Sequence, residues 1–254
     1  MTEQITGGSS PASGRVTTAI ILAGGLGTRL SGVVQDRPKP LAPISGRPFL
    51  EHQMDYWMAQ GIMRFILSVG FKREQIMQHF GGSYRGCKIG YAEETTPLGT
   101  GGGLLMAIRE LGSKETCLVL NGDTFFEVDL VALDDFHGAR KAELSVALFE
   151  TGRNNRYMGV QMREDGRIVS FKSRPGDGQL ANGGVYLMNA GLFEDLPWRV
   201  GDKLSLEEDF FSHLLSAGRK LFGLACPGRF IDIGVPDDYF RAADVIEGRL
   251  EGGR

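Results

Sequence analysis

The chain has 254 residues, of which 42% are hydrophobic and 23% are charged, and its formal net charge is -3 at pH 7. This size and composition predict one soluble α/β domain with a sizeable core. The mildly acidic charge disfavours bulk nucleic-acid binding, but it allows one nucleotide in a locally basic pocket. No apolar run approaches the ~18 residues of a membrane span, so we expect no membrane partner.

The first residues are polar and rich in glycine, serine and threonine. Because residues 1–16 lack the apolar centre of a signal peptide, we interpret them as a flexible tail on a cytoplasmic protein. Residues 17–254 are then a single domain. Cys87, Cys117 and Cys226 form no CxxC pair, and the four histidines lack zinc-ligand spacing. Neither a disulfide framework nor a zinc site is therefore predicted.

Short apolar runs alternate with amphipathic stretches in the first half of the chain. The apolar runs predict strands at 17–23, 65–70, 87–94 and 117–123. The amphipathic stretches predict helices at 49–61, 72–80 and 102–111. This β-α-β-α order predicts a Rossmann-like, three-layer α/β/α fold with a mostly parallel central sheet.

The pattern changes after residue 150. Residues 157–175 alternate between apolar and polar around Asp165-Gly166, which predicts an additional antiparallel hairpin. A strand at 181–188 follows, and then a helix at 205–218, where Ser205 and Glu208 have the spacing of a capping box. We interpret residues of about 17–125 as a nucleotide-binding half and about 126–254 as a half that binds a sugar phosphate.

The segment LAGGLGTRL, residues 22–30, allows several interpretations. It could be a simple glycine turn. Gly25 and Gly27 fit the first two positions of a Rossmann fingerprint, but the third falls on Leu30, and no Gly-Lys-Ser/Thr follows as in a P-loop. What remains is another kind of polyphosphate loop, in which main-chain amides approach the phosphates and Arg29 offers a planar fork to their oxygens.

Three further charged residues extend this hypothesis. Lys39 lies between Pro38 and Pro40, which hold it on a stiff, extended segment. Asp123 ends the strand at 117–123, where parallel sheets bind ligands, although an aspartate there could equally cap a helix. Asp232 lies among apolar residues, where a carboxylate is costly unless it meets a cation. Two such carboxylates in one cleft would bind Mg²⁺ through their oxygens.

The chain resembles the sugar-1-phosphate nucleotidyltransferase family from about residue 17 onward. The motifs that carry the resemblance occur in family order: LAGGLGTRL, RPKPLAPISGRPFLEHQ, PLGTGGGL, LNGD, NGGVY and FIDIGVPDDY. The resemblance implies a nucleotidyltransferase fold and a Mg²⁺-dependent reaction, in which a sugar 1-phosphate attacks a nucleoside triphosphate and pyrophosphate is released. It further implies a role in the biosynthesis of surface polysaccharide, such as capsule or lipopolysaccharide, and leaves a homo-oligomer open.

The resemblance also assigns roles to residues. It implies catalytic roles for Arg29, Lys39 and Arg174, and metal binding by Asp123 and Asp232. The residues implied to bind the nucleotide are Leu22, Gly24, Gly25, Gly27, Thr28, Arg29, Glu94, Gly99 and Thr100. The residues implied to bind the sugar phosphate are Asn121, Gly159, Lys172, Arg174, Asn182, Gly183 and Glu207. The segment FKSRP replaces the family's Phe-x-Glu-Lys-Pro, so either Arg174 or Lys172 could hold the sugar phosphate.

The base and the sugar are suggested by different arguments. Guanine presents two adjacent N–H donors, and an ionised Glu94 could accept both, whereas the alternative is that Glu93 or Glu94 simply faces water. The sequence most closely resembles the branch that uses GTP and D-glycero-α-D-manno-heptose 1-phosphate. A uridylyl-, cytidylyl- or thymidylyltransferase for another hexose 1-phosphate remains an alternative, as does a non-catalytic module that binds nucleotide sugars.

Overall fold

The protein is described by a computed structural model that covers residues 15–30, 32–34, 36–151, 157–173 and 179–249. One large sheet runs through it in the order β11-β10-β12-β7-β1-β4-β6-β5. In addition, β9 pairs with β12, and β13 pairs with β9. Its strands are β1 (Thr18–Ala23), β4 (Arg64–Val69), β5 (Ser83–Tyr84), β6 (Cys87–Glu93), β7 (Thr116–Asn121), β9 (Leu144–Glu150), β10 (Gly159–Met162), β11 (Ile168–Ser173), β12 (Leu180–Asn189) and β13 (Leu221–Ala225).

The two halves of the chain differ in how their strands pair. In the first half, β1 pairs in parallel with β4 and β7, and β4 pairs in parallel with β6. In the second half, β12 runs antiparallel to β7 and β9, and β10 and β11 form an antiparallel hairpin. The predicted fold class, a mostly parallel α/β sheet with an antiparallel addition, is confirmed.

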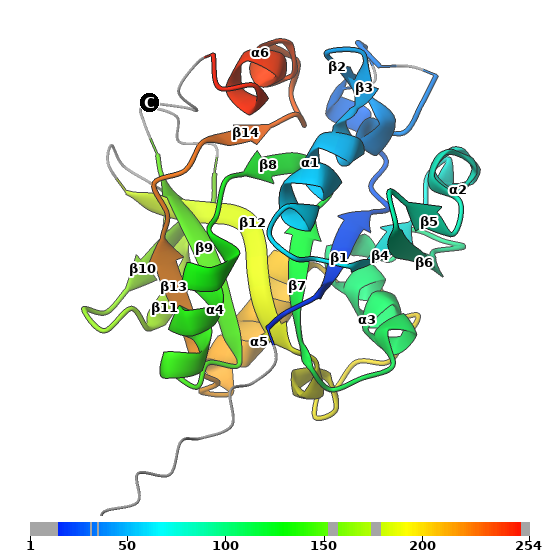
Figure 1. The fold of residues 1–254 in the computed structure, drawn as a ribbon. Helices are drawn as coiled ribbons and strands as arrows, with labels where there is room; N and C mark the ends of the chain where they lie inside the picture. The colour runs from blue at the N-terminus through cyan, green and yellow to red at the C-terminus, as the bar shows by residue number, and fades with distance from the viewer. Residues whose placement is uncertain (1–14, 31, 35, 152–156, 174–178, 250–254) are drawn as a thin grey trace, which may run out of the picture.

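Helices cover both faces of the sheet (Figure 1). One face packs against α1 (Phe49–Met58), α2 (Arg73–Phe80) and α4 (Leu130–Ala139), and the other packs against α3 (Gly99–Leu111) and α5 (Phe211–Ser216). On β1, Ile21 lies in the same cluster as Trp57 of α1, whereas Ile20 lies with Leu104 of α3. Because both faces are buried, this strand is a continuous apolar run in the sequence.

A smaller lobe lies beyond the carboxyl ends of β1 and β7, at the top of Figure 1. It contains η1 (Thr28–Leu30), η2 (Lys39–Leu41), β2 (Pro43–Ile44), β3 (Arg47–Pro48), β8 (Thr124–Phe126), β14 (Phe230–Asp232) and α6 (Pro236–Ile246). Phe49, Phe125, Ile231 and Val245 belong to its separate apolar cluster. The lobe carries the predicted charged residues over the end of the sheet.

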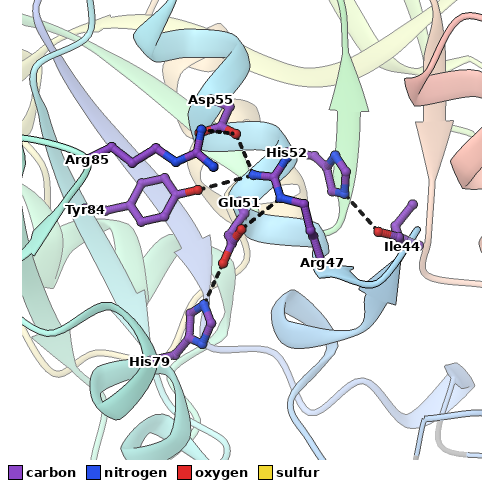
Figure 2. Close-up of polar contacts among 8 residues, drawn as sticks. All are labelled: Ile44, Arg47, Glu51, His52, Asp55, His79, Tyr84 and Arg85. Atoms are coloured by element: carbon purple, nitrogen blue, oxygen red, sulfur yellow. Dashed lines mark hydrogen bonds and ion pairs between the residues drawn. The ribbon is translucent and has the colours of Figure 1, made fainter.

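Arg47 anchors the hairpin formed by β2 and β3 (Figure 2). Its Nε donates to Glu51 at 3.1 Å, and its Nη2 donates to Asp55 at 2.6 Å and to the hydroxyl of Tyr84 at 3.3 Å. His79 of α2 also contacts Glu51, at 2.8 Å. These contacts attach the hairpin to α1, α2 and β5.

The predicted hairpin at Asp165-Gly166 is confirmed, because β10 and β11 pair there and Gly166 has a φ of 84°. The capping box is only half correct. Ser205 Oγ accepts from the N–H of Glu208 at 3.1 Å, but Asp209, rather than Glu208, accepts from the N–H of Ser205 at 2.7 Å. The first turn, η4 (Leu206–Phe210), is a wide π-turn. The carboxylate that meets the N–H of Ser205 is therefore the one four residues on, that of Asp209.

Other boundaries differ from the sequence prediction. Helix α3 begins at Gly99, three residues before the predicted start, and α4 and β13 were not predicted. Residues 1–14 of the predicted tail lie outside the described residues, whereas Val16 is buried in the core.

The cysteines are free thiols, and within the described ranges no helix has the length and apolarity that crossing a membrane requires.

Candidate active site

Two adjoining cavities open beyond the carboxyl end of β1, one toward β7 and the smaller lobe and the other toward β4 and α3. The first, here called the acidic cavity, has a volume of about 350 Å³ and is lined by Lys39, Asp123 and Asp232 among others. The second, here called the glycine cavity, has a volume of about 320 Å³. Seven of the residues predicted to bind a nucleotide line the glycine cavity: Leu22, Gly24, Gly25, Gly27, Glu94, Gly99 and Thr100. Leu22, Gly25 and Thr100 line both cavities and so connect them.

Glu94 forms the buried floor of the glycine cavity and is 8% exposed. Its two carboxylate oxygens accept from Ser68 Oγ and from the N–H of Leu98, each at 3.1 Å. Desolvation by burial raises the pKa of Glu94, although these two hydrogen bonds oppose the shift. A Cβ on Gly24 would lie 2.2 Å from Glu94 Oε1, and one on Gly103 would lie 2.8 Å from it. These glycines therefore make room for the carboxylate, a role that the sequence analysis did not assign to them.

The amino end of α3 is attached to the segment around residue 205. The N–H groups of Gly101 and Gly102 donate to the carbonyl of Leu204, at 3.0 and 3.2 Å. Thr100 Oγ1 accepts from the N–H of Leu206 at 2.9 Å and donates to Glu207 at 3.2 Å. Because Thr100 and Glu207 both line the acidic cavity, this contact joins the nucleotide-binding and sugar-binding halves that the sequence predicts.

Lys39 and the two predicted metal ligands meet in the acidic cavity. Lys39 Nζ donates to Asp123 Oδ2 at 2.8 Å, and the two side chains are 12% and 31% exposed. Asp232 lies opposite Thr124 in the pairing of β8 with β14, and the N–H of Ile233 donates to the carbonyl of Asp123 at 2.9 Å. The backbones that carry the two carboxylates are therefore neighbours.

Gly234 lets these charges come close together. Its N–H donates to Asp232 Oδ1 at 2.6 Å, and a Cβ at this position would lie 3.3 Å from Lys39 Nζ. Arg29, from η1, is exposed and also lines the acidic cavity. The arrangement offers two cationic side chains to an anion, next to two carboxylates.

The donor set fits a magnesium ion. Mg²⁺ in proteins is commonly held by one or two carboxylates together with water and substrate phosphates. Asp123 and Asp232 supply such a pair at the edge of a cavity. Within the described part of the chain, no group of three or more histidine, cysteine, aspartate or glutamate side chains could hold a metal ion. The remaining ligands would thus be water and phosphate oxygens.

The predicted sugar-phosphate residues are only partly brought together. Asn121, Asn182 and Glu207 line the acidic cavity, and Asn182 Nδ2 donates to the buried hydroxyl of Tyr186 at 2.8 Å. Neither Gly159 nor Gly183 is among the described residues that line the two cavities. A Cβ on Gly183 would lie 2.4 Å from the ring of Phe126, so this glycine permits close packing.

Some assignments fall outside what the structure describes. Arg174 lies outside the described residues, as do the side chains of Lys172 and Thr28. Conversely, Tyr157, Met158 and Lys203 line the cavities but were not predicted. They lie in loops between elements, and their sequence neighbourhoods contain no pattern that distinguishes them from surface residues.

Comparison with known proteins places the chain in a family. The chain matches the model of the family described as "Nucleotidyl transferase" over residues 18–248. It therefore belongs to the nucleotidyl transferase family.

Among its relatives is the D-glycero-alpha-D-manno-heptose 1-phosphate guanylyltransferase of Aneurinibacillus thermoaerophilus, which is 42% identical over 90% of this chain and 98% of the relative. The enzyme of the same name from Campylobacter jejuni is 40% identical over 87% of this chain and 96% of its own length. The crystal structure of HddC from Yersinia pseudotuberculosis has a TM-score of 0.78 and 32% identity, and covers 92% of this chain and all of that one. HddC has also been solved in complex with GMP-PN.

Proposed function

We propose that this protein transfers GMP from GTP to D-glycero-α-D-manno-heptose 1-phosphate, which yields the GDP-sugar and pyrophosphate. The observation that carries the proposal is the acidic cavity, which is lined by Lys39, Arg29, Asp123 and Asp232 and which adjoins the glycine cavity. The names of the relatives at 40–42% identity support GTP and the heptose as the substrates.

The reaction exchanges one phosphorus–oxygen bond for another. A phosphate oxygen of the sugar 1-phosphate attacks the α-phosphorus of GTP and forms the new bond. The bond from that phosphorus to the oxygen bridging to the β-phosphorus breaks, and pyrophosphate leaves with the electron pair. Because the nucleophile is already anionic, no general base is needed. The main obstacle is repulsion between two polyanions.

The charged residues of the acidic cavity lower this repulsion. Lys39 and Arg29 contact phosphate oxygens and stabilise the charge that develops on the leaving pyrophosphate. Asp123 and Asp232 would hold Mg²⁺, which supplies Lewis-acid stabilisation of phosphate oxygens when bound. Asn121, which lines the same cavity, contacts the sugar phosphate.

Glu94 is proposed to read the base. It lines the glycine cavity, and each carboxylate oxygen has a further lone pair beyond the bond that it accepts from Ser68 or Leu98. Guanine can donate its N1–H and N2–H to these lone pairs. Uracil and thymine offer only one such donor, and cytosine N3 is itself an acceptor.

The proposed function is tested by a panel of pyrophosphate-release assays that crosses GTP, ATP, CTP and UTP with several sugar 1-phosphates. We expect the highest kcat/KM for GTP with D-glycero-α-D-manno-heptose 1-phosphate. Lys39→Met protein serves as the control for contaminating activity. A higher kcat/KM with another nucleotide or another sugar would overturn the proposed substrate pair.

The same panel tests the base-reading residue. In Glu94→Gln, an amide NH₂ replaces one acceptor, so we expect the preference for GTP to fall by about tenfold or more, as for one lost hydrogen bond to a charged group. Glu93→Gln is the matched control, because the Glu93 side chain is 46% exposed and pairs with Arg73. An unchanged base profile in Glu94→Gln would reject this role for Glu94.

A further inference from the structure

Gln53 of α1 is a buried polar residue, 2% exposed, beneath the turn that carries Asp123. Its Nε2 donates to the carbonyl of Asn121 and to the carbonyl of Thr124, both at 2.8 Å. These two carbonyls flank the turn formed by Gly122 and Asp123. One side-chain amide thus holds both ends of the turn.

The backbone of the turn is also held from two other directions. The N–H of Gly122 donates to the carbonyl of Leu22 in β1 at 3.0 Å. A Cβ on Gly122 would lie 2.4 Å from that same carbonyl oxygen, so the turn lies directly against β1. The carbonyl of Asp123 accepts from Ile233, immediately after β14. Gln53 supplies the support from α1.

The requirement at position 53 is for a hydrogen-bond donor. Both N–H groups of the amide are used, and a reversed amide would turn its oxygen toward two carbonyl oxygens. Gln53 Oε1 is buried and has no hydrogen-bond partner among the described residues. The structure leaves one acceptor of this side chain unpaired while both donors are satisfied.

We propose that Gln53 is a positioning residue that fixes the Asp123 turn and thereby the affinity of the site for its divalent ion. This rests on the assignment of Asp123 as a metal ligand under the proposed function. Without the two hydrogen bonds, the carbonyls of Asn121 and Thr124 lose their donor. The turn then relaxes, and the Asp123 carboxylate moves away from its place in the acidic cavity. Residues that orient metal ligands typically change metal affinity by about 10–100-fold when they are replaced.

The test measures Mn²⁺ binding to the folded, nucleotide-free protein through the loss of the free-ion EPR signal. Gln53→Met keeps the length of the side chain and removes the donor, and Gln53→Asn keeps a donor that reaches less far. Gln60→Met is the matched control, because Gln60 also bonds the backbone of a distant segment, donating to Val128 at 3.1 Å and accepting from Leu130 at 2.8 Å. Asp123→Asn is the reference for loss of a metal ligand.

We expect Gln53→Met to weaken Mn²⁺ binding by about 10–100-fold, Gln53→Asn to weaken it less, and Gln60→Met to leave it unchanged. In turnover assays, the Mg²⁺ concentration for half-maximal rate should rise in Gln53→Met, while the KM for GTP at saturating Mg²⁺ stays constant. Thermal melting identifies any variant that does not fold. If Gln53→Met does not, Gln53→Asn decides, and unchanged Mn²⁺ affinity there overturns the proposal.

The remaining outcomes separate this proposal from its premise. If Asp123→Asn loses Mn²⁺ and a folded Gln53→Met retains it, Gln53 is only structural and the metal site still stands. If Gln60→Met weakens Mn²⁺ binding equally, the effect reflects general loss of stability and the proposal is wrong. If Asp123→Asn itself retains Mn²⁺, the assignment of Asp123 as a ligand fails, and the role of Gln53 fails with it.

Discussion

Two cations, Arg47 in the β2–β3 hairpin and Lys39 in η2 before it, have contrasting environments. Arg47 is 38% exposed, and its guanidinium is shared between Glu51, Asp55 and Tyr84 (Figure 2). Lys39 is only 12% exposed, yet among the described residues its ammonium has a single carboxylate contact, with Asp123. The more buried cation is thus the one with fewer protein partners.

This difference separates a structural ion network from the proposed binding site. An ammonium has three N–H donors, so Lys39 retains donors for a ligand, and it faces a cavity. The donors of Arg47 are directed at side chains of its own neighbourhood. In this protein, the number of charges around a cation therefore does not by itself identify the proposed site; the spare donors of Lys39 do.

The first prediction removes Lys39, the cation that has spare N–H donors. Lys39→Met should lower kcat/KM by about 10²–10³, the typical cost of losing one electrostatic contact to a transition state. Mn²⁺ binding to the nucleotide-free protein should become tighter, because the carboxylate of Asp123 loses its competing cation. Steady-state kinetics and Mn²⁺ titration measure the two effects.

A retained rate in Lys39→Met would contradict the proposed role of this residue. Lys72→Met is a suitable control, because Lys72 lies on the amino side of α2 and over the ring of Phe71 rather than at the acidic cavity. Its kcat/KM should match that of the parent protein.

The second prediction removes the cation whose donors are committed. Arg47→Met should lower the free energy of unfolding by about 1–2 kcal/mol, between the values for exposed and buried ion pairs. Its carboxylate neighbours lose a partner, although Arg85 still contacts Asp55 at 3.1 Å. The loss in kcat/KM should be far smaller than in Lys39→Met. Urea unfolding and kinetics on the same preparations test this, and the opposite ranking of the two variants would refute the distinction.

The sequence predicted mainly those features of the fold that depend on a local pattern of residues. Apolar runs identified β1, β4, β6 and β7. The prolines on both sides of Lys39 predicted an extended segment, which is wrong, because Lys39 begins the 3-10 turn η2. The antiparallel hairpin followed from Asp165-Gly166, whose turn requires only neighbouring residues. These features are encoded by residues close together in the chain.

The rest depends on contacts between distant segments. Gly24 and Gly103 were interpreted from the chain as parts of a phosphate loop and a helix, but the packing of Glu94 against both is visible only in the fold. Glu51 is four residues from Arg47, but the other two partners of Arg47, Asp55 and Tyr84, are eight and 37 residues away, and only the fold brings them to it. Asp209, rather than Glu208, accepts from the N–H of Ser205 because the first turn is a π-turn. The spacing of the residues in the sequence does not reveal this turn.

The smallest expected effect concerns the pH dependence of the Arg47 network. Glu51 is 14% exposed and accepts from His79 at 2.8 Å and from Arg47 at 3.1 Å. Desolvation by burial tends to raise the pKa of Glu51, but the hydrogen bonds and charges of His79 and Arg47 together outweigh it, so the pKa lies below its usual range. A carboxylate whose pKa is lower in the folded state stabilises the fold above its unfolded pKa. This contribution is lost as the pH falls through the folded pKa.

Glu51→Gln should therefore destabilise the protein at pH 6 but flatten the decline of stability below about pH 4.5, since the amide does not titrate. Urea unfolding at pH 6, 5, 4 and 3 measures this slope. Glu74→Gln is the control, because the Glu74 side chain is 76% exposed and pairs with Arg73 rather than with a member of the Arg47 network. A slope in Glu51→Gln as steep as that of the parent would mean that the network stabilises the hairpin through packing rather than charge. Arg47 and Lys39 would then differ only in how many of their N–H donors are already used.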